Sequence, residues 1–332
     1  MIQTKIEVLK AYYGDCIFVT ICYDGKEYVI MIDGGTPRSY CHSGRYGRTE
    51  DGVLKIKLSQ LKKEGRAIDL LIITHVDDDH IGGVLAWFRD QMPTVDFVKR
   101  IWLNDDVEIN IGKGLDNTSG QAASLIKLLK ENSIPFEDKI VKRREFTFEW
   151  GRMVVLAPTS EAHNKIAEDI GDELNNATND RYDEEIKKLL EEPYERGACT
   201  QENDASMAFL LQTNEDENIL LLGDADIDTV MDSLYHVEGI TFPLKCSWVK
   251  LSHHGSKNNF KPEFLKMIDA ENFIISTNGM KFGHPDKEVI AYLVDKTSAK
   301  MWYNYPERVE KIFTEQDKRD YPDIDDRLRF FE

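Results

Sequence analysis

The sequence lacks long apolar runs. None approaches the length of a membrane-spanning helix, and the first residues, Met1–Val8, contain no basic start followed by an apolar stretch. We therefore expect a cytoplasmic protein with no membrane partner. The chain has 332 residues, of which 41% are hydrophobic, and this is enough to bury a full core as one large domain or as two closely packed halves.

The sequence is also poor in cysteine. Its five cysteines are scattered, their number is odd, and no two of them form a C-x-x-C pair. This pattern predicts neither a disulfide framework nor a cysteine metal site. We expect the thiols to be reduced and structural.

Positive charge is in deficit, because 42 Lys and Arg residues stand against 60 Asp and Glu residues, for a net charge of −18. Such a charge opposes the long-range attraction of DNA or RNA and counts against a free-standing, non-specific nuclease. Phosphodiester chemistry is not excluded, since bound divalent ions reverse the local potential and a partner protein could supply basic surface.

The most informative feature present is a cluster of histidines and carboxylates that directly follows an apolar strand. The segment Leu71–Gly83 reads LIITHVDDDHIGG, with an H-x-D-x-D-H spacing. Its four candidate metal ligands are His75, Asp77, Asp79 and His80. We expect Gly82-Gly83 to form a turn before an apolar helix around Val84–Phe88. The alternative is a solvated acidic turn with a capping histidine, but charge runs seldom follow a buried strand directly. A metal-binding loop is therefore the preferred interpretation.

Three further polar clusters come later in the chain. Asp224 follows an apolar strand, where it is either a helix N-cap or a ligand. Adjacent His253 and His254 are followed by Gly, Ser and Lys, which suggests a ligand or proton donor beside an anion-binding turn rather than a simple solvated turn. A lone histidine, His284, stands at the entry to a helix.

Strand-like and helix-like segments alternate along the chain, which predicts the α/β class. A charged stretch at residues 160–202 is poor in large apolar residues and interrupts this alternation, although it is compatible with helices at Ile166–Leu174 and Tyr182–Leu190. We interpret it as a helical insertion that covers one edge of the fold, or else as a mobile acidic linker.

Taken together, these clusters resemble the motifs of the metallo-β-lactamase superfamily. Asp33 in Ile32–Gly35 corresponds to motif 1, the His75–His80 segment to motif 2, Asp224 to motif 4 and His284 to motif 5. With Leu251–Lys257 (LSHHGSK), the set resembles the C-terminal metallohydrolase domain of ComEC and its stand-alone soluble relatives. The resemblance covers about Ile2 to Tyr303. It implies an αββα sandwich over residues 1–305, followed by a C-terminal extension at 306–332.

Two departures from the superfamily pattern affect the choice of metal. Asp77 stands where motif 2 usually has a second histidine, and Glu202-Asn203-Asp204 replace the motif 3 histidine. His163 lies in the charged stretch and is not a candidate replacement. A harder, more anionic site favours manganese, with zinc or magnesium as alternatives, and one of two divalent positions is expected to be weak.

The resemblance implies a role for each cluster. The expected metal ligands are His75, Asp77, Asp79, His80, Asp224 and His284. Asp33 is expected to orient one of these ligands without contacting the metal itself. The candidate catalytic residues are His253, His254 and Asp79, and the candidate substrate-binding residues are Ser256 and Lys257.

The expected function is a metal-dependent phosphodiesterase or nuclease that acts on DNA, RNA or a nucleotide. The resemblance to ComEC supplies this direction, because the spacing of the ligands alone indicates only metal-assisted hydrolysis. Two alternatives remain. One is a small-molecule hydrolase acting on a cyclic nucleotide, lactone or thioester, and the other is a non-catalytic subunit of a larger assembly.

Overall fold

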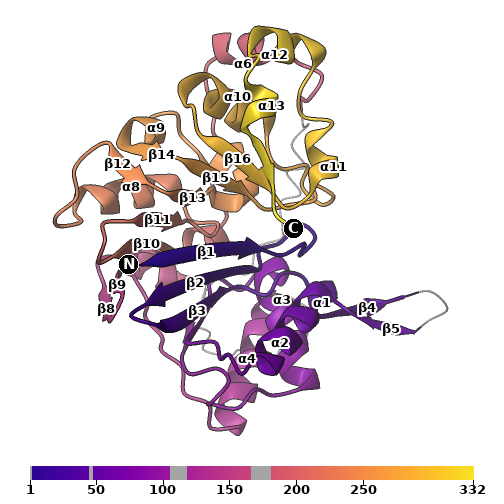
Figure 1. The fold of residues 1–332 in the computed structure, drawn as a ribbon, viewed down its shortest axis with the longest axis vertical. Helices are drawn as coiled ribbons and strands as arrows, with labels where there is room; N and C mark the ends of the chain where they lie inside the picture. Colours follow the sequence, from indigo (N-terminus) through magenta and orange to yellow (C-terminus); the bar gives the residue numbers. More distant parts are fainter. Residues whose placement is uncertain (1, 45–47, 105–117, 166–180) are drawn as a thin grey trace. The chain divides into compact units, whose positions relative to one another are not determined.

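The computed structural model describes residues 2–44, 48–104, 118–165 and 181–332 (Figure 1). The chain divides into two compact units. Unit 1 comprises residues 1–141 and 159–172, and unit 2 comprises residues 142–158 and 173–332.

Unit 1 is built on a five-stranded sheet in the order β1-β2-β3-β6-β7. The strands are β1 (Gln3–Val8), β2 (Ile17–Tyr23), β3 (Lys26–Ile32), β6 (Leu70–Ile73) and β7 (Ile101–Leu103). The first three form an antiparallel meander, whereas β3, β6 and β7 run parallel. Because parallel neighbours end at the same sheet edge, the residues that follow β3 and β6 lie side by side.

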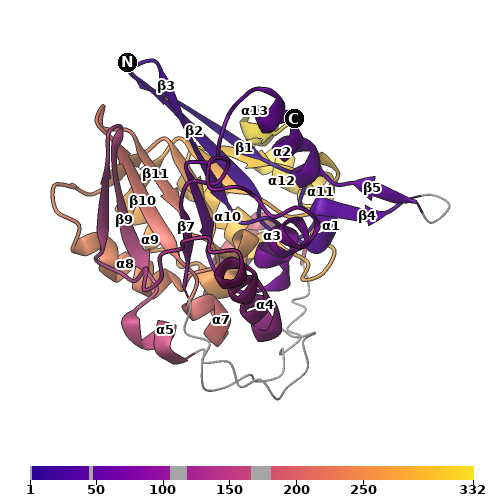
Figure 2. The same cartoon turned by 90° about the horizontal axis from the view of Figure 1, so that it is seen from below.

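Helices pack against one face of this sheet. They are α1 (Pro37–Tyr40), α2 (Val53–Lys63), α3 (Asp78–Asp90) and α4 (Thr118–Glu131), with the short α5 (Ser160–Lys165) completing the unit. Alternate strand residues such as Phe18, Met31 and Leu71 point into a core shared with Leu58 of α2 and Trp87 of α3. A hairpin of β4 (Cys41–Ser43) and β5 (Thr49–Asp51) projects from α1 (Figures 1 and 2).

Unit 2 is built on an eight-stranded sheet in the order β17-β16-β15-β13-β11-β10-β9-β8. The strands are β8 (Glu145–Phe148), β9 (Gly151–Ala157), β10 (Ala208–Thr213), β11 (Asn218–Leu221), β13 (Trp248–Lys250), β15 (Asn272–Ile275), β16 (Lys300–Tyr303) and β17 (Leu328–Phe330). The run from β11 to β17 is parallel and the run from β8 to β11 is antiparallel. A separate pair joins β12 (Leu244–Cys246) to β14 (Ile268–Ala270).

The helices of unit 2 are mostly short. They are α6 (Ile186–Glu191), α7 (Gln201–Asp204), α8 (Ile227–Tyr235), α9 (Phe264–Met267), α10 (Lys287–Lys296), α11 (Pro306–Val309), α12 (Glu315–Asp320) and α13 (Ile324–Arg327). The amphipathic helices α8 and α10 bury Val230, Leu234, Ile290 and Leu293 in the core of this unit.

The C-terminal segment is part of the unit 2 sheet. Residues 306–332 were expected to be an extension, yet β17 pairs in parallel with β16. The buried guanidinium of Arg327 donates to the backbone carbonyls of Leu293, Val294 and Ala299. These bonds tie the segment to the end of α10 and to the loop before β16.

Part of the charged stretch at residues 160–202 packs into unit 2. The helix expected around Ile166–Leu174 lies outside the described residues, but Ile186 and Leu189 of α6 and nearby Tyr182 are buried in the unit 2 core.

Within the described ranges, no helix combines the length and the apolar character needed to cross a membrane. All five cysteines are free thiols, and burial raises the pKa of Cys246 to about 12.

Candidate metal centre

In unit 1, the candidate ligands come from the loop after β6 and the first turn of α3. Nε2 of His75 lies 3.6 Å from Oδ2 of Asp77, and Nε2 of His80 lies 4.0 Å from Oδ2 of Asp79. Ligands about 2.1 Å from one tetrahedral ion are about 3.4 Å apart, so each pair is near the spacing that a shared metal requires. The rings of His75 and His80 are themselves adjacent, with centroids 4.1 Å apart.

Asp33, at the end of β3, orients both histidines. Its Oδ2 accepts a hydrogen bond of 2.8 Å from Nδ1 of His80 and one of 2.7 Å from the Thr74 hydroxyl. The same hydroxyl lies 3.0 Å from Nδ1 of His75, so it accepts from that ring while donating to Asp33. With the proton of each imidazole on Nδ1, the lone pair of each is on Nε2. Carboxylate-held imidazoles of this kind are typical of metal ligands.

Asp77 is the N-cap residue of α3, but its side chain makes no capping hydrogen bond. An N-cap aspartate ordinarily accepts hydrogen bonds from the backbone N–H groups of the first turn. The Asp77 carboxylate instead approaches His75. The next residue, Asp78, accepts a 2.7 Å bond from the amide of Gln121 on α4. Of the three consecutive carboxylates, Asp78 therefore has a structural partner, whereas Asp77 and Asp79 face the histidines.

The expectation that Gly82-Gly83 forms a turn is wrong, because α3 begins at Asp78 and includes both glycines. Their role is close packing. A Cβ atom at Gly83 would lie 2.0 Å from the carbonyl oxygen of Gly34, and the backbone N–H of Gly83 donates to Gly35. This contact brings the start of α3 against the loop that carries Asp33, and hence His80 within reach of Asp33.

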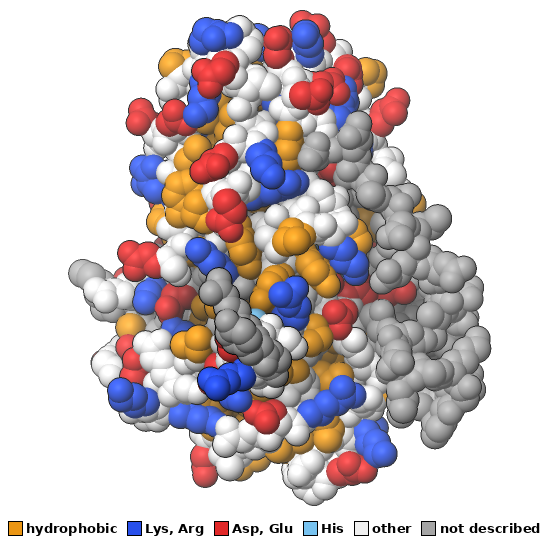
Figure 3. Space-filling model, turned by 90° about the vertical axis from the view of Figure 1, so that its right-hand side faces the viewer, with side chains coloured by type: hydrophobic (Ala, Val, Ile, Leu, Met, Phe, Trp, Pro, Cys, Tyr) orange, Lys and Arg blue, Asp and Glu red, His pale blue; other side chains and the backbone are white. Residues whose placement is uncertain are grey.

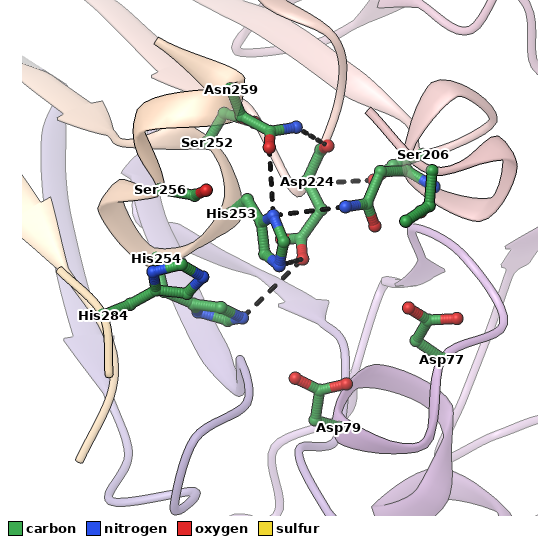
Figure 4. Close-up of polar contacts among 12 residues, drawn as sticks. Asp77, Asp79, Ser206, Asp224, Ser252, His253, His254, Ser256, Asn259 and His284 are labelled. Atoms are coloured by element: carbon green, nitrogen blue, oxygen red, sulfur yellow. Dashed lines mark hydrogen bonds and ion pairs between the residues drawn. The ribbon is translucent and has the colours of Figure 1, made fainter. Parts of the chain in front are cut away.

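In unit 2, the candidate residues follow the parallel strands β11, β13 and β15. Asp224 comes after β11, the His253-His254 pair after β13 and His284 after β15, so one edge of the sheet carries all three clusters. The Ser206 hydroxyl accepts from the backbone N–H of Asp224, and the N–H of His253 donates to the carbonyl of Gly223. Figure 4 shows the side chains of these clusters.

His254 has the hydrogen bonding of a metal ligand. Its Nδ1 lies 2.7 Å from the backbone carbonyl of Ser276, to which it donates, so the lone pair is on Nε2. Nε2 is 3.7 Å from Oδ2 of Asp224, and the side chain is buried. Both His253 and His254 have positive φ angles, 45° and 56°, which is uncommon for residues other than glycine and marks a constrained loop.

His253 is held by two asparagines, of which Asn259 is labelled in Figure 4. Its Nδ1 lies 3.0 Å from Oδ1 of Asn259, whose amide donates at 2.8 Å to the carbonyl of Asp224, and 3.2 Å from Nδ2 of Asn203. Its Nε2 is 3.8 Å from Oδ2 of Asp224, and 20% of the side chain is exposed. Desolvation, opposed by the charge of Asp224, lowers the pKa of His253 to about 4. The ring is therefore neutral at pH 7.

His284 lies beside His253, with ring centroids 4.9 Å apart. Its Nδ1 is 3.6 Å from Oδ2 of Asp286. The same Asp286 oxygen accepts from the backbone N–H of Lys257 at 2.7 Å, which connects the His284 loop to the turn after the histidine pair.

The two expected substrate-binding residues have local partners. The Ser256 hydroxyl accepts from the N–H of Asn258 as an N-cap, and the ammonium of Lys257 forms an ion pair of 3.2 Å with Glu288. Both groups are thus engaged with partners inside the protein, and neither contact by itself directs the hydroxyl or the ammonium towards a bound anion.

Unit 1 thus gathers Asp33, His75, Asp77, Asp79 and His80, and unit 2 gathers Asp224, His253, His254 and His284. Sequence reasoning missed Thr74 and Asn259. Thr74 was detectable as the residue between the strand and the first ligand. No sequence signal distinguished Asn259 from its neighbour Asn258.

Comparison with known proteins gives one family match. Residues 9–96 match the model of the Metallo-beta-lactamase superfamily. This segment contains Asp33 and the whole His75–His80 motif, and so includes the candidate residues of unit 1. No curated protein matches the sequence.

Solved structures with a similar course include a "possible metal-dependent hydrolase" from Veillonella parvula DSM 2008 (11% identity, 100% of this chain and 97% of that chain, TM-score 0.43). An isothiocyanate hydrolase from Delia radicum gut bacteria is similar at 13% identity, over 99% of this chain and 96% of that chain, with a TM-score of 0.41.

Proposed function

We propose that this protein is a divalent-metal-dependent hydrolase whose substrates are phosphodiesters of DNA, RNA or nucleotides. The observation that carries the proposal is the hydrogen-bonded relay Asp33–Thr74–His75 with its branch from Asp33 to His80. A buried carboxylate that fixes two neighbouring imidazoles with Nε2 as the acceptor is the arrangement that supports a metal ion.

The donor set fits such an ion. His75 with Asp77 and Asp79 with His80 would hold metal in unit 1, and Asp224 with His254 has matching donors in unit 2. His284 stays in the proposed ligand set on the strength of its motif. A bound divalent ion would supply a water of lowered pKa and shield the charge of the phosphate. The carboxylate-rich set supports a preference for manganese over zinc.

His253 is the proton carrier in this proposal. Its ring is neutral at pH 7 and one-fifth exposed, so Nε2 carries a lone pair that would take a proton from the attacking water, although the lowered pKa makes this nitrogen a weak base. The protonated ring then returns that proton to the leaving alkoxide. Asn259 holds Nδ1 throughout and keeps Nε2 as the reacting nitrogen.

Two observations bear on the substrate. The resemblance of the motifs to the ComEC metallohydrolase domain supports a phosphodiester. The net charge of −18 weakens attraction of a long polyanion, and the face in Figure 3 mixes acidic and basic side chains without a continuous basic stripe among its described residues. We therefore place short or single-stranded substrates, or a polymer delivered by a basic partner, ahead of free duplex DNA.

The test is purification followed by metal analysis and by assay against single- and double-stranded DNA, RNA and cyclic nucleotides, with manganese, magnesium or zinc. Turnover of a phosphodiester with manganese that disappears in His80→Ala and Asp224→Ala is expected. Maximal turnover with zinc and none with manganese would overturn the metal assignment.

The acidic surface supports a second candidate, a small-molecule hydrolase, because a neutral lactone or thioester is not repelled by a net charge of −18. Activity on those esters in the absence of phosphodiester turnover would favour it. Metal binding without turnover of any of these substrates would favour a non-catalytic subunit.

A further inference from the structure

We infer that Arg308 and Tyr182 are positioning residues for His284. The inference rests on the proposed function, in which His284 belongs to the metal-binding set. Arg308 comes from α11 in the C-terminal segment, Tyr182 from the charged stretch, and the two meet on the loop that carries His284.

The contacts of Arg308 are with the backbone of this loop. Its Nε donates to the carbonyl of His284 at 3.2 Å, and Nη2 donates to the carbonyl of Gly283. Nη2 also donates to the Tyr182 hydroxyl at 2.8 Å, while the guanidinium lies 4.6 Å from the centroid of the Tyr182 ring. A planar group with fixed donors therefore holds two successive carbonyls and stacks on the aromatic ring that supports it.

Tyr182 also contacts the backbone of this loop, and together with Arg308 it forms a clamp on residues 283–285. Its buried hydroxyl is 2.6 Å from the carbonyl of Pro285 and 3.0 Å from that of Gly283. The carbonyls on both sides of His284, as well as its own, thus accept bonds from these two side chains. Fixing the backbone at residues 283–285 fixes the direction from which the His284 ring leaves it.

Gly279, at the start of the same loop, makes room for the guanidinium. A Cβ atom there would lie 2.2 Å from Nε of Arg308, and the φ angle of Gly279 is +68°. The loop has a residue without a side chain at the place where Arg308 passes. This fit favours a clamp that needs an arginine in this orientation over a chance surface contact.

The experiment compares wild-type protein with Arg308→Ala, Arg308→Lys and Tyr182→Phe. Arg319→Ala is the matched control, because Arg319 is an exposed arginine in the same segment that bonds the amide oxygen of Gln316. Each metal-free protein is titrated with manganese, kcat and KM are measured on the best substrate, and thermal unfolding is followed without metal. Guanidinium chloride at low millimolar concentration is added to Arg308→Ala as a chemical substitute for the lost group.

Arg308→Ala and Arg308→Lys should bind manganese 10- to 100-fold more weakly, the range for lost partners of a ligand. Tyr182→Phe should show a smaller loss in the same direction, and guanidinium should restore several-fold of the affinity lost in Arg308→Ala without affecting Arg319→Ala. Wild-type affinity in Arg308→Ala would overturn the inference. So would a loss that guanidinium leaves unchanged and that follows the fall in melting temperature, since this indicates a structural role alone. If no substrate is turned over but the manganese affinities change as expected, the proposed reaction fails and the positioning role stands.

Discussion

At the scale of single residues, hydrogen bonds behind the candidate ligands determine what those ligands do. Asp33 accepts from His80 and Thr74 through one oxygen and from the backbone N–H of Thr74 through the other. A carboxylate is needed because every one of these neighbours donates. An amide in its place would present a donor to a donor.

Asp33→Asn should therefore weaken metal binding 10- to 100-fold while the protein stays folded. The matched control is Asp78→Asn, which changes a neighbouring carboxylate whose partner is Gln121. Metal titration of the metal-free proteins is the measurement. Equal affinities in the two variants would show that Asp33 does not act through His80.

The two adjacent histidines should separate by function. His254→Ala should lose bound metal, whereas His253→Ala should keep it. The His253 variant should lose rate by about 10²–10⁴-fold on a substrate with a poor leaving group, and less on an activated nitrophenyl phosphodiester that needs no protonation. Metal content and both rates are measured on each variant. Equal losses on both substrates together with loss of metal from His253→Ala would make His253 a ligand.

The lowered pKa of His253 predicts how the stability of the metal-free protein depends on pH. The ring titrates near pH 6.5 when unfolded and near pH 4 when folded, so between these values the unfolded chain binds the extra proton. The stability present above pH 6.5 is therefore lost as pH falls toward 4. Urea unfolding at pH 7, 6 and 5 measures the loss, which should be smaller in His253→Gln. An unchanged pH dependence in that variant would assign the effect to other groups.

At the scale of elements, α3 shows how much the sequence could predict. The spacing of histidines and carboxylates identified the unit 1 candidates and the strand before them. The helix start was placed too late, because Gly82-Gly83 indicated a turn, whereas tertiary contact with Gly34 makes the glycines necessary within the helix. The partner of His254, the Ser276 carbonyl, comes from the loop after β15, and its meeting with the loop after β13 depends on strand order. Strand order is a property of long-range pairing that local patterns do not encode.

Gly83→Ala tests the packing of α3. The added methyl group would meet backbone that cannot easily move, at a typical cost of about 1–3 kcal/mol, which outweighs the roughly 1 kcal/mol that alanine gains over glycine in a helix. Gly197→Ala is the control, since its nearest neighbour is the movable end of the Asn258 side chain. Denaturant unfolding should show a clear loss for Gly83→Ala alone. A neutral or stabilising effect would mean that the loop after β3 can move away from the added methyl group.

At the scale of the whole molecule, the C-terminal segment, residues 306–332, is an integral part of the unit 2 fold. Asp317 on α12 accepts from the buried ammonium of Lys287 at 2.7 Å and from the backbone N–H of Ile186 at 2.7 Å. One carboxylate thus joins α6, α10 and α12. The sequence suggested an extension because the motif pattern ends near Tyr303, and pattern matching does not report what covers a sheet edge.

Asp317→Ala should lower the free energy of unfolding by about 3–5 kcal/mol, because it leaves the buried charge of Lys287 without its carboxylate. Asp320→Ala, on the same helix, removes a carboxylate whose partner Lys187 is largely exposed, so its effect on the free energy of unfolding should be much smaller. Thermal and urea unfolding compare the two. Similar losses in both variants would show that burial of the Lys287–Asp317 pair does not matter.

The order of synthesis gives the Asp33 relay a further consequence. The members of this relay, Asp33, Thr74, His75 and His80, all lie before residue 81, and the longest of its hydrogen-bonded links spans 47 positions. The ribosome therefore adds all of these residues long before it adds Asp224. In a chain still being synthesised, unit 1 would offer metal the imidazoles of His75 and His80 before Asp224 and the later histidines exist.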